Sequence, residues 1–288
     1  MGFFKSFRIT LEMIKFEHTV FALPFALLSA ILASEGWPGK SKLFWIILAM
    51  VGARSAAMAF NRLADWQIDA QNPRTQSHAL PAGQLSRSFA LLFTVGSSLL
   101  FISATYRLNP LCFRLSLPVL LILLFYSYTK RFTHYSHFIL GFCLGMAPLG
   151  AWIAVRGDVR MTPILLCIIV MLWTAGFDII YACQDVEFDR RKDLFSIPKR
   201  FGIKAALNIS SALHLLMLFL LMSLFYLESL GWISLAGIAL VACLLWYEHS
   251  LVRPNDLSKV NAAFFTVNGY ISILLLLAVG LDKLVLGR

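Results

Sequence analysis

The sequence predicts an all-α, polytopic membrane protein with nine transmembrane helices. Of its 288 residues, 59% are hydrophobic and only 14% are charged, whereas a soluble domain averages about 25% charged residues. The mean hydropathy is +0.76, and the apolar residues form long uninterrupted runs instead of the alternation typical of an outer-membrane strand. These observations exclude a soluble globular enzyme, a disordered chain, a disulfide-linked scaffold and a β-barrel.

Nine apolar runs are long enough to cross a bilayer, which takes about 20 residues. The first run is poor in apolar residues, and its helix is expected to start in the polar stretch before it. Because no internal repeat or low-complexity linker divides the chain, residues 1–288 are predicted to form a single domain. The runs cover residues 17–34, 43–62, 88–106, 109–127, 137–155, 162–182, 205–227, 230–248 and 260–282.

The basic residues predict the orientation of these helices. Although the net charge is +10, Lys and Arg form no arm long enough for nucleic acid, so no nucleic-acid partner is expected. The N-terminal segment and the loops after every second run contain 15 Lys and Arg, against seven in the opposite loops and the C-terminus, and three lie within the runs. Because positive loops face the cytoplasm, we expect a multi-pass protein of the cell inner membrane with even-numbered loops cytoplasmic and Arg288 outside.

Acidic residues gather at the predicted cytoplasmic ends of the second and sixth runs. Acids beside a membrane core are costly and usually functional. The first acidic segment, residues 61–69, contains Asn61, Asp65 and Asp69 at a spacing of four. On a helix this spacing places all three side chains on one face.

The second acidic segment, residues 178–193, shows a similar pattern. Glu187 points away from the shared face and is expected to be solvated. The residues that recur at spacings of three and four, and so share one helix face, are Asp178, Tyr181, Asp185 and Asp189.

Apart from Cys183, both segments supply oxygen ligands with no His or Cys nearby, a donor set that favours Mg²⁺ over zinc or copper. Mg²⁺ typically binds one or two carboxylates together with substrate phosphate oxygens. Two acidic segments that face each other across a cavity therefore predict a Mg²⁺–diphosphate site. The alternative is a pair of helix ends that form surface salt bridges with Arg190, Arg191 and Lys192.

Three further side chains lie on the same side. Tyr126 and Lys130, four apart at the end of the fourth run, can donate to phosphate oxygens; the alternative is an interfacial tyrosine with a snorkelling lysine. Arg54 precedes Asp65 by eleven residues, which brings it within about 20° of the same helix face. It can pair with a carboxylate or phosphate of a substrate, or it can neutralise Asp178.

These motifs resemble those of the UbiA superfamily of intramembrane prenyltransferases, over essentially the whole chain. Three motifs in chain order carry the resemblance: Asn61-Arg62-x-x-Asp65-x-x-x-Asp69, Tyr126-x-x-x-Lys130 and Asp185-x-x-x-Asp189. Within the superfamily, shorter stretches are most similar to bacterial 4-hydroxybenzoate polyprenyltransferases: Glu17-His18-Thr19, Gly52-Ala53-Arg54, Asn72-Pro73-Arg74-Thr75, Leu80-Pro81-Ala82-Gly83 and Tyr181-x-x-Gln184-Asp185.

The resemblance implies Mg²⁺-dependent transfer of a polyprenyl group from polyprenyl diphosphate to an aromatic acid of the 4-hydroxybenzoate type, in ubiquinone or menaquinone biosynthesis. Some similar proteins act instead on 1,4-dihydroxy-6-naphthoate. The helices would surround a central cavity open to the cytoplasmic side and laterally to lipid. The metal ligands would be Asn61, Asp65, Asp69, Asp185 and Asp189; the four aspartates and Lys130 would be catalytic; Arg54, Arg62, Tyr126, Lys130, Asp178 and Tyr181 would bind the substrates.

Two other classes of membrane protein match the sequence less well. A proton-coupled secondary transporter would place its acids near mid-span and in two matching halves. A membrane phosphotransferase of the CDP-alcohol type would need two aspartates of its pattern on one helix with preceding glycines, and this chain lacks that pattern.

Overall fold

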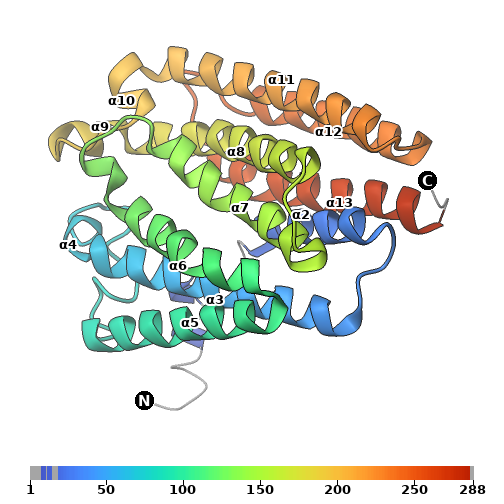
Figure 1. Ribbon diagram of the computed structural model, residues 1–288. Helices are drawn as coiled ribbons and strands as arrows, with labels where there is room; N and C mark the ends of the chain where they lie inside the picture. Colours follow the sequence, from blue (N-terminus) through green and yellow to red (C-terminus); the bar gives the residue numbers. More distant parts are fainter. Residues whose placement is uncertain (1–7, 11, 15–18, 286–288) are drawn as a thin grey trace. The chain divides into compact units, whose positions relative to one another are not determined.

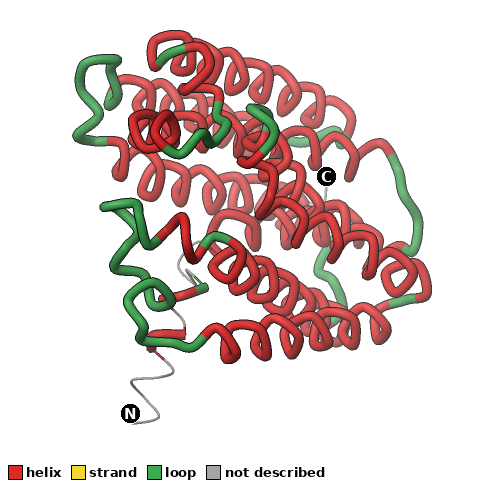
Figure 2. Tube along the Cα trace, turned by 90° about the vertical axis from the view of Figure 1, so that its left-hand side faces the viewer, coloured by secondary structure: helices red, strands yellow, loops and turns green. Residues whose placement is uncertain are grey.

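The computed structural model describes residues 8–10, 12–14 and 19–285 of the chain. Apart from an isolated bridge between Arg253 and Asp256, the regular elements of these residues are helical (Figures 1 and 2). Eight of the described helices are long and apolar enough to cross a membrane. The expected all-α, multi-span fold is confirmed. Glu17, His18 and Arg288, on which expectations were based, lie outside the described residues.

The helices fall where the apolar runs predict them. The first run corresponds to α2 (Thr19–Ser34), which has 16 residues, slightly fewer than the roughly 17 that a span needs, so the count of nine stays a prediction. The other runs correspond to α3 (Lys40–Ala64), α5 (Arg87–Leu108), α6 (Pro110–Phe125), α7 (Ser136–Arg156), α8 (Met161–Ala182), α11 (Ile203–Leu227), α12 (Trp232–Ser250) and, after the π-helical turn η4 (Ala262–Val267), α13 (Asn268–Val285).

The chain forms two compact units. The first covers residues 1–19 and 41–128 and is built on α3, α5 and α6. Small residues let α3 and α5 approach closely, because a Cβ atom on Gly52 would lie only 2.7 Å from the backbone nitrogen of Phe101. Ala56 of α3, Phe101 of α5 and Leu120 of α6 belong to one buried apolar cluster.

The second unit covers residues 20–40 and 129–288. Its most buried helix is α8, and both α7 and α11 pack along it (Figure 1). Trp173 and Phe177 of α8 lie at the centre of the core, with ring centroids 5.0 Å apart, and Phe25 of α2 lies 5.1 Å from Trp173. Aromatic side chains of α2 and α8 therefore meet in this core, among the aliphatic side chains that make up most of it.

Two glycines bring the backbones of α7 and α8 into contact. A Cβ atom on Gly141 would lie 2.3 Å from the carbonyl oxygen of Met171, and one on Gly145 would lie 2.5 Å from that of Cys167. Membrane helices approach this closely only where small residues four apart leave room. The spacing of Gly141 and Gly145 therefore determines how α7 packs.

Buried polar side chains link α8, α12 and α13. Trp173 Nε1 donates to Asn268 Oδ1 (2.6 Å), and Asn268 Nδ2 donates to Glu248 Oε1 (3.0 Å); all three residues are 0% exposed. Asn268 also donates to the carbonyl oxygens of Ala263 and Phe264 in η4, at 3.0 and 3.3 Å. These bonds satisfy backbone carbonyls of the π-helical turn, which apolar surroundings require.

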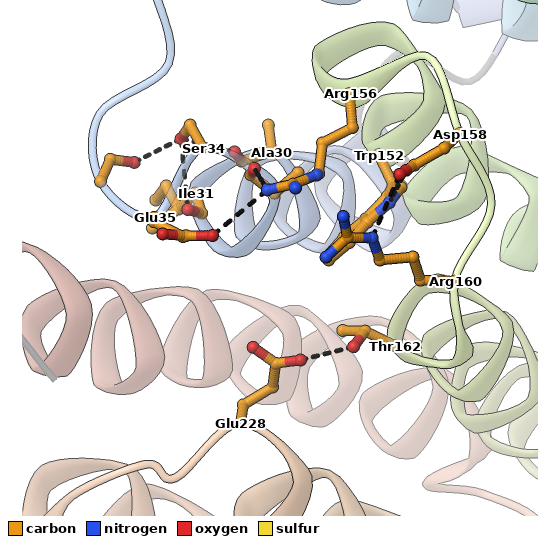
Figure 3. A network of polar contacts seen from close by, with 12 residues as sticks. Ala30, Ile31, Ser34, Glu35, Trp152, Arg156, Asp158, Arg160, Thr162 and Glu228 are labelled. Carbon is orange, nitrogen blue, oxygen red and sulfur yellow. Dashed lines mark hydrogen bonds and ion pairs between the residues drawn. The ribbon is translucent and has the colours of Figure 1, made fainter.

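Polar contacts join several helix ends of the second unit near the start of α8 (Figure 3). Arg156 Nη1 donates to the carbonyl oxygen of Ala33 at 3.3 Å and pairs with Glu35 at 3.2 Å. Thr162 at the start of α8 donates to the carboxylate of Glu228. Hydrogen bonds and an ion pair therefore hold the helix ends together on this side of the unit.

The start of α12 depends on a residue of α13. Gly231 precedes α12 and offers no side-chain cap. Asp282, which is 0% exposed, accepts hydrogen bonds from the amides of Gly231 (3.0 Å) and Ser234 (2.7 Å). A carboxylate at this position satisfies free amides of the first turn and interacts favourably with the helix dipole.

Candidate active site

The first acidic segment lies where α3 ends. Asp65 has backbone angles of φ −100° and ψ 6°, and the short helix α4 (Trp66–Asp69) follows it. Backbone hydrogen bonds from Asp65 to Asn61 (2.9 Å) and from Asp69 to Asp65 (2.8 Å) continue the helical spacing through this break. Because Asn61 Nδ2 donates to Asp65 Oδ2 at 3.1 Å, these two side chains lie together on one face.

Asp69 is held by basic side chains of its own unit. Arg62 Nη1 donates to Asp69 Oδ2 at 3.1 Å, and His78 Nδ1 lies 3.6 Å from the same oxygen. Burial acts to raise the pKa of Asp69, but the contact with His78 and the charge of Arg62 outweigh it, so the pKa is lowered. The expectation that no histidine lies near the acids is therefore wrong at Asp69.

The second acidic segment has a similar break. After α8, the 3₁₀ turn η3 (Cys183–Asp185) leads to α9 (Val186–Arg191), and Asp185 has φ −98° and ψ 3°, close to the angles of Asp65. Asp185 and Asp189 are 6% and 2% exposed. This burial argues against a pair of surface salt bridges. The predicted exposure of Glu187 is confirmed, since its side chain is 73% exposed and pairs with Arg190.

Asp178 has a partner that sequence reasoning missed. His137 of α7 is fully buried, and its Nδ1 lies 2.6 Å from Asp178 Oδ2. The amide of Ile197 donates to His137 Nε2 at 3.4 Å, which assigns the proton of a neutral imidazole to Nδ1. The one sequence signal for His137 is that it opens the apolar run 137–155.

Tyr181 belongs to an aromatic cluster beside the second acidic segment. Its ring centroid lies 4.2 Å from that of Phe264 in η4, and Phe264 in turn lies 5.1 Å from Phe177 and 5.7 Å from Phe21. Edge-to-face and tilted contacts of this kind stabilise aromatic clusters beyond the area that they bury. The cluster forms an apolar wall one helical turn before Asp185.

The third motif lies on the 3₁₀ helix η2 (Tyr126–Arg131), which follows α6 and carries Tyr126 and Lys130. The carbonyl oxygen of Lys130 accepts a hydrogen bond from the amide of Phe195 at 2.7 Å. The charges of Lys130 and Asp185 both act on Asp189. The structure thus brings Lys130 next to the second acidic segment.

The predicted site residues divide between the two units, and Arg54 is a half-buried residue of α3. Among the described residues, no group of three or more His, Cys, Asp or Glu side chains could hold a metal alone. The predicted ligands offer carboxylate and amide oxygens, a donor type that suits Mg²⁺, which takes few carboxylates and completes its shell with water and phosphate. The first unit contains Arg54, Asn61, Arg62, Asp65, Asp69 and Tyr126; the second contains Lys130, Asp178, Tyr181, Asp185 and Asp189.

Fold and site together define a class: a multi-span, all-helical membrane protein with carboxylate pairs at helix breaks. The UbiA prenyltransferase family matches residues 22–270. A relative from Methylobacillus flagellatus named 4-hydroxybenzoate octaprenyltransferase is 30% identical over 82% of this chain and 80% of its own length. Another of that name, from Aromatoleum aromaticum, is 28% identical over 87% and 85%. The chain belongs to the UbiA prenyltransferase family and is a prenyltransferase.

Solved structures share the fold. The apo structure of a UbiA homolog from Aeropyrum pernix has a TM-score of 0.85 and 33% identity, and covers 93% of this chain and 98% of that one. A UbiA homolog from Archaeoglobus fulgidus, bound to DMAPP and Mg²⁺, has a TM-score of 0.74 over 94% and 97% of the two chains. At 18% identity, that second likeness shows the fold alone. Membership of the family leaves no place for the transporter or phosphotransferase alternatives.

Proposed function

We propose that the chain, as a single domain, transfers a polyprenyl group from polyprenyl diphosphate to an aromatic acid of the 4-hydroxybenzoate type, in ubiquinone or menaquinone biosynthesis. The names of the bacterial relatives support this acceptor. The observation that carries the proposal is the burial of Asp185 and Asp189 at a helix break next to Lys130. Burying acids beside a membrane core is energetically unfavourable, so their presence indicates that they bind a cation or a substrate.

The proposed metal is Mg²⁺, with Asn61, Asp65, Asp69, Asp185 and Asp189 as the residues that would hold it. Bound there, Mg²⁺ would neutralise charge that develops on the departing diphosphate. The DMAPP and Mg²⁺ of the Archaeoglobus homolog agree with a metal-bound allylic diphosphate as the donor in this family.

The chain's own residues would act around that headgroup. Lys130, Tyr126 and Arg62 would donate hydrogen bonds to diphosphate oxygens and so stabilise their charge as the C–O bond of the donor breaks. Tyr181 and its neighbours Phe264 and Phe177 would keep water from the allylic cation until the electron-rich ring carbon of the acceptor attacks it. The prenyl tail would leave the cavity laterally into lipid.

The identity of the acceptor is tested by product mass. We expect purified protein with Mg²⁺ and a polyprenyl diphosphate, offered 4-hydroxybenzoate and 1,4-dihydroxy-6-naphthoate together, to release pyrophosphate and to form prenylated 4-hydroxybenzoate. A product that carries only the naphthoate would move the protein to the other quinone route. Absence of pyrophosphate release with either acid would contradict the proposed reaction.

Arg54 is assigned to the acceptor. It lies about 16 Å from Asp65 along α3 (eleven residues at ~1.5 Å each), too far to share the diphosphate but suited to the carboxylate of an aromatic acid. Arg54→Lys keeps the charge but loses the two-pronged guanidinium contact. We expect the KM for the aromatic acid to rise about 10-fold while the KM for the prenyl diphosphate stays nearly constant. A rise confined to the prenyl diphosphate would assign Arg54 to the donor.

The active site is proposed to face the cytoplasm. In a chain whose exposed Cys243 is changed to Ser, a cysteine at Gln71 or Lys192 should react with a membrane-impermeant maleimide only from the cytoplasmic side. A cysteine at Val159 should react only from outside. All three positions are exposed, whereas Ser196 is fully buried and would be a poor probe. Labelling of Gln71 and Val159 from the same side would contradict this topology.

A further inference from the structure

The loop between α9 and α10 (Ile197–Phe201) contacts several candidate site residues at once. We define the loop segment as residues 193–197, which includes Ile197, the first residue of α10; Ser196 and Ile197 are both buried. The amide of Phe195 donates to the carbonyl oxygen of Lys130 at 2.7 Å, and the amide of Ile197 donates to His137, the partner of Asp178. The loop segment therefore touches the surroundings of both Lys130 and Asp178.

Its closest contact is with Asp189. The hydroxyl of Ser196 donates to Asp189 Oδ2 at 2.7 Å, and neither residue is more than 2% exposed. The same oxygen of Ser196 accepts a hydrogen bond from the amide of Lys199 at 3.3 Å, as the N-cap of α10. A serine hydroxyl has one proton, so this pattern directs that proton to the carboxylate.

Ser196 is the one hydrogen-bond donor to the Asp189 carboxylate among the residues that the structure describes. The bond ends on Oδ2, and so it orients the carboxylate without occupying Oδ1. Hydrogen bonds of this kind fix metal ligands in other proteins, and their removal typically lowers metal affinity about 10- to 100-fold. The buried position of Ser196 excludes water as a ready substitute donor.

We propose that Ser196 is a positioning residue for Asp189: its hydroxyl holds Oδ2 and so presents Oδ1 to the divalent cation of the diphosphate site. This inference rests on the proposed function, in which Asp189 is a metal ligand. The loop segment 193–197 then serves to hold Asp189 and Lys130 in a constant mutual arrangement, since it binds one through a side chain and the other through the backbone.

The test is the affinity of the purified protein for Mn²⁺ in the presence of an unreactive thio analogue of a prenyl diphosphate, measured by electron paramagnetic resonance of the protein-bound ion. Two variants separate the contact with Asp189 from the helix cap. Ser196→Ala removes both the donor and a good cap, whereas Ser196→Gly removes the donor but is nearly as good a cap as serine. If Ser196 positions Asp189, both variants should weaken Mn²⁺ binding by about 10-fold or more.

Ser210→Ala is the matched control, because Ser210 is also fully buried and donates one hydrogen bond, to the carbonyl oxygen of Gly176 at 2.8 Å. It should bind Mn²⁺ as the unaltered protein does. If Ser196→Ala weakens Mn²⁺ binding but Ser196→Gly does not, Ser196 acts only as a helix cap. If Ser210→Ala weakens Mn²⁺ binding equally, the effect comes from packing. Either result overturns the inference.

Asp189→Asn distinguishes this inference from the proposed function. If it weakens Mn²⁺ binding while both variants of Ser196 bind normally, the metal site stands and the positioning role is wrong. If Asp189→Asn binds Mn²⁺ normally, the metal assignment itself is wrong, and the role of Ser196 is overturned with it.

Discussion

Asp65→Asn and Asp185→Asn are each expected to lower the rate of prenyl transfer by about 100-fold or more at saturating Mg²⁺. Each substitution keeps the shape of the side chain but removes a charge that the proposed metal site needs. Both residues occupy the same position, at a break between a long apolar helix and a short polar one. The measurement is the initial rate of pyrophosphate release by protein in detergent or vesicles.

The double variant should be little worse than either single one, because groups that act as a unit show strongly non-additive effects. Glu187→Gln is the matched control: it removes an acid two residues from Asp185 whose side chain is exposed and paired with Arg190. Its rate should be close to that of the unaltered protein. Near-normal turnover of either aspartate variant would show that the metal site is assigned to the wrong residues.

Gly141→Ala is expected to destabilise the protein by about 3 kcal/mol, enough to lower the yield of folded protein. The new methyl group would lie 2.3 Å from the carbonyl oxygen of Met171 and 3.0 Å from two other backbone atoms of that residue. Backbone atoms cannot rotate away as a flexible side chain can, so α7 must move off α8. The measurement is the midpoint of thermal unfolding in detergent.

Gly150→Ala, on the same helix, is expected to have the opposite effect on stability. A Cβ atom there meets nothing within 4 Å, and alanine favours the helix over glycine by up to about 1 kcal/mol. This variant should be as stable as the unaltered protein or slightly more so. If both substitutions had the same effect, helix propensity and not the contact between α7 and α8 would explain the result.

The helices were predictable because each apolar run follows directly from the thickness of a bilayer. For α8 the agreement is close, because the predicted run 162–182 and the observed helix Met161–Ala182 differ by one residue. The spacing of Asn61 and Asp65 likewise predicted a shared face, which their hydrogen bond supports. Periodicity conveys these features because they depend only on residues close in sequence.

The partners of the acids were not predictable. His137 lies 41 residues from Asp178, and His78 lies nine residues beyond Asp69 in an irregular turn. No periodicity extends across such distances or through such turns. The breaks at Asp65 and Asp185 were also missed, because neither a proline nor a glycine marks them.

The contact between Asp282 and the start of α12 has a consequence for how the protein is made. The amides of Gly231 and Ser234 find their acceptor in a residue that is synthesised 48 or more positions later. Until then α12 would enter the bilayer with unsatisfied amides in its first turn, which hydrocarbon penalises by several kcal/mol each. The stable unit of insertion at this end of the chain is therefore the helical hairpin of α12 and α13, and synthesis that stalls between them would leave α12 poorly anchored.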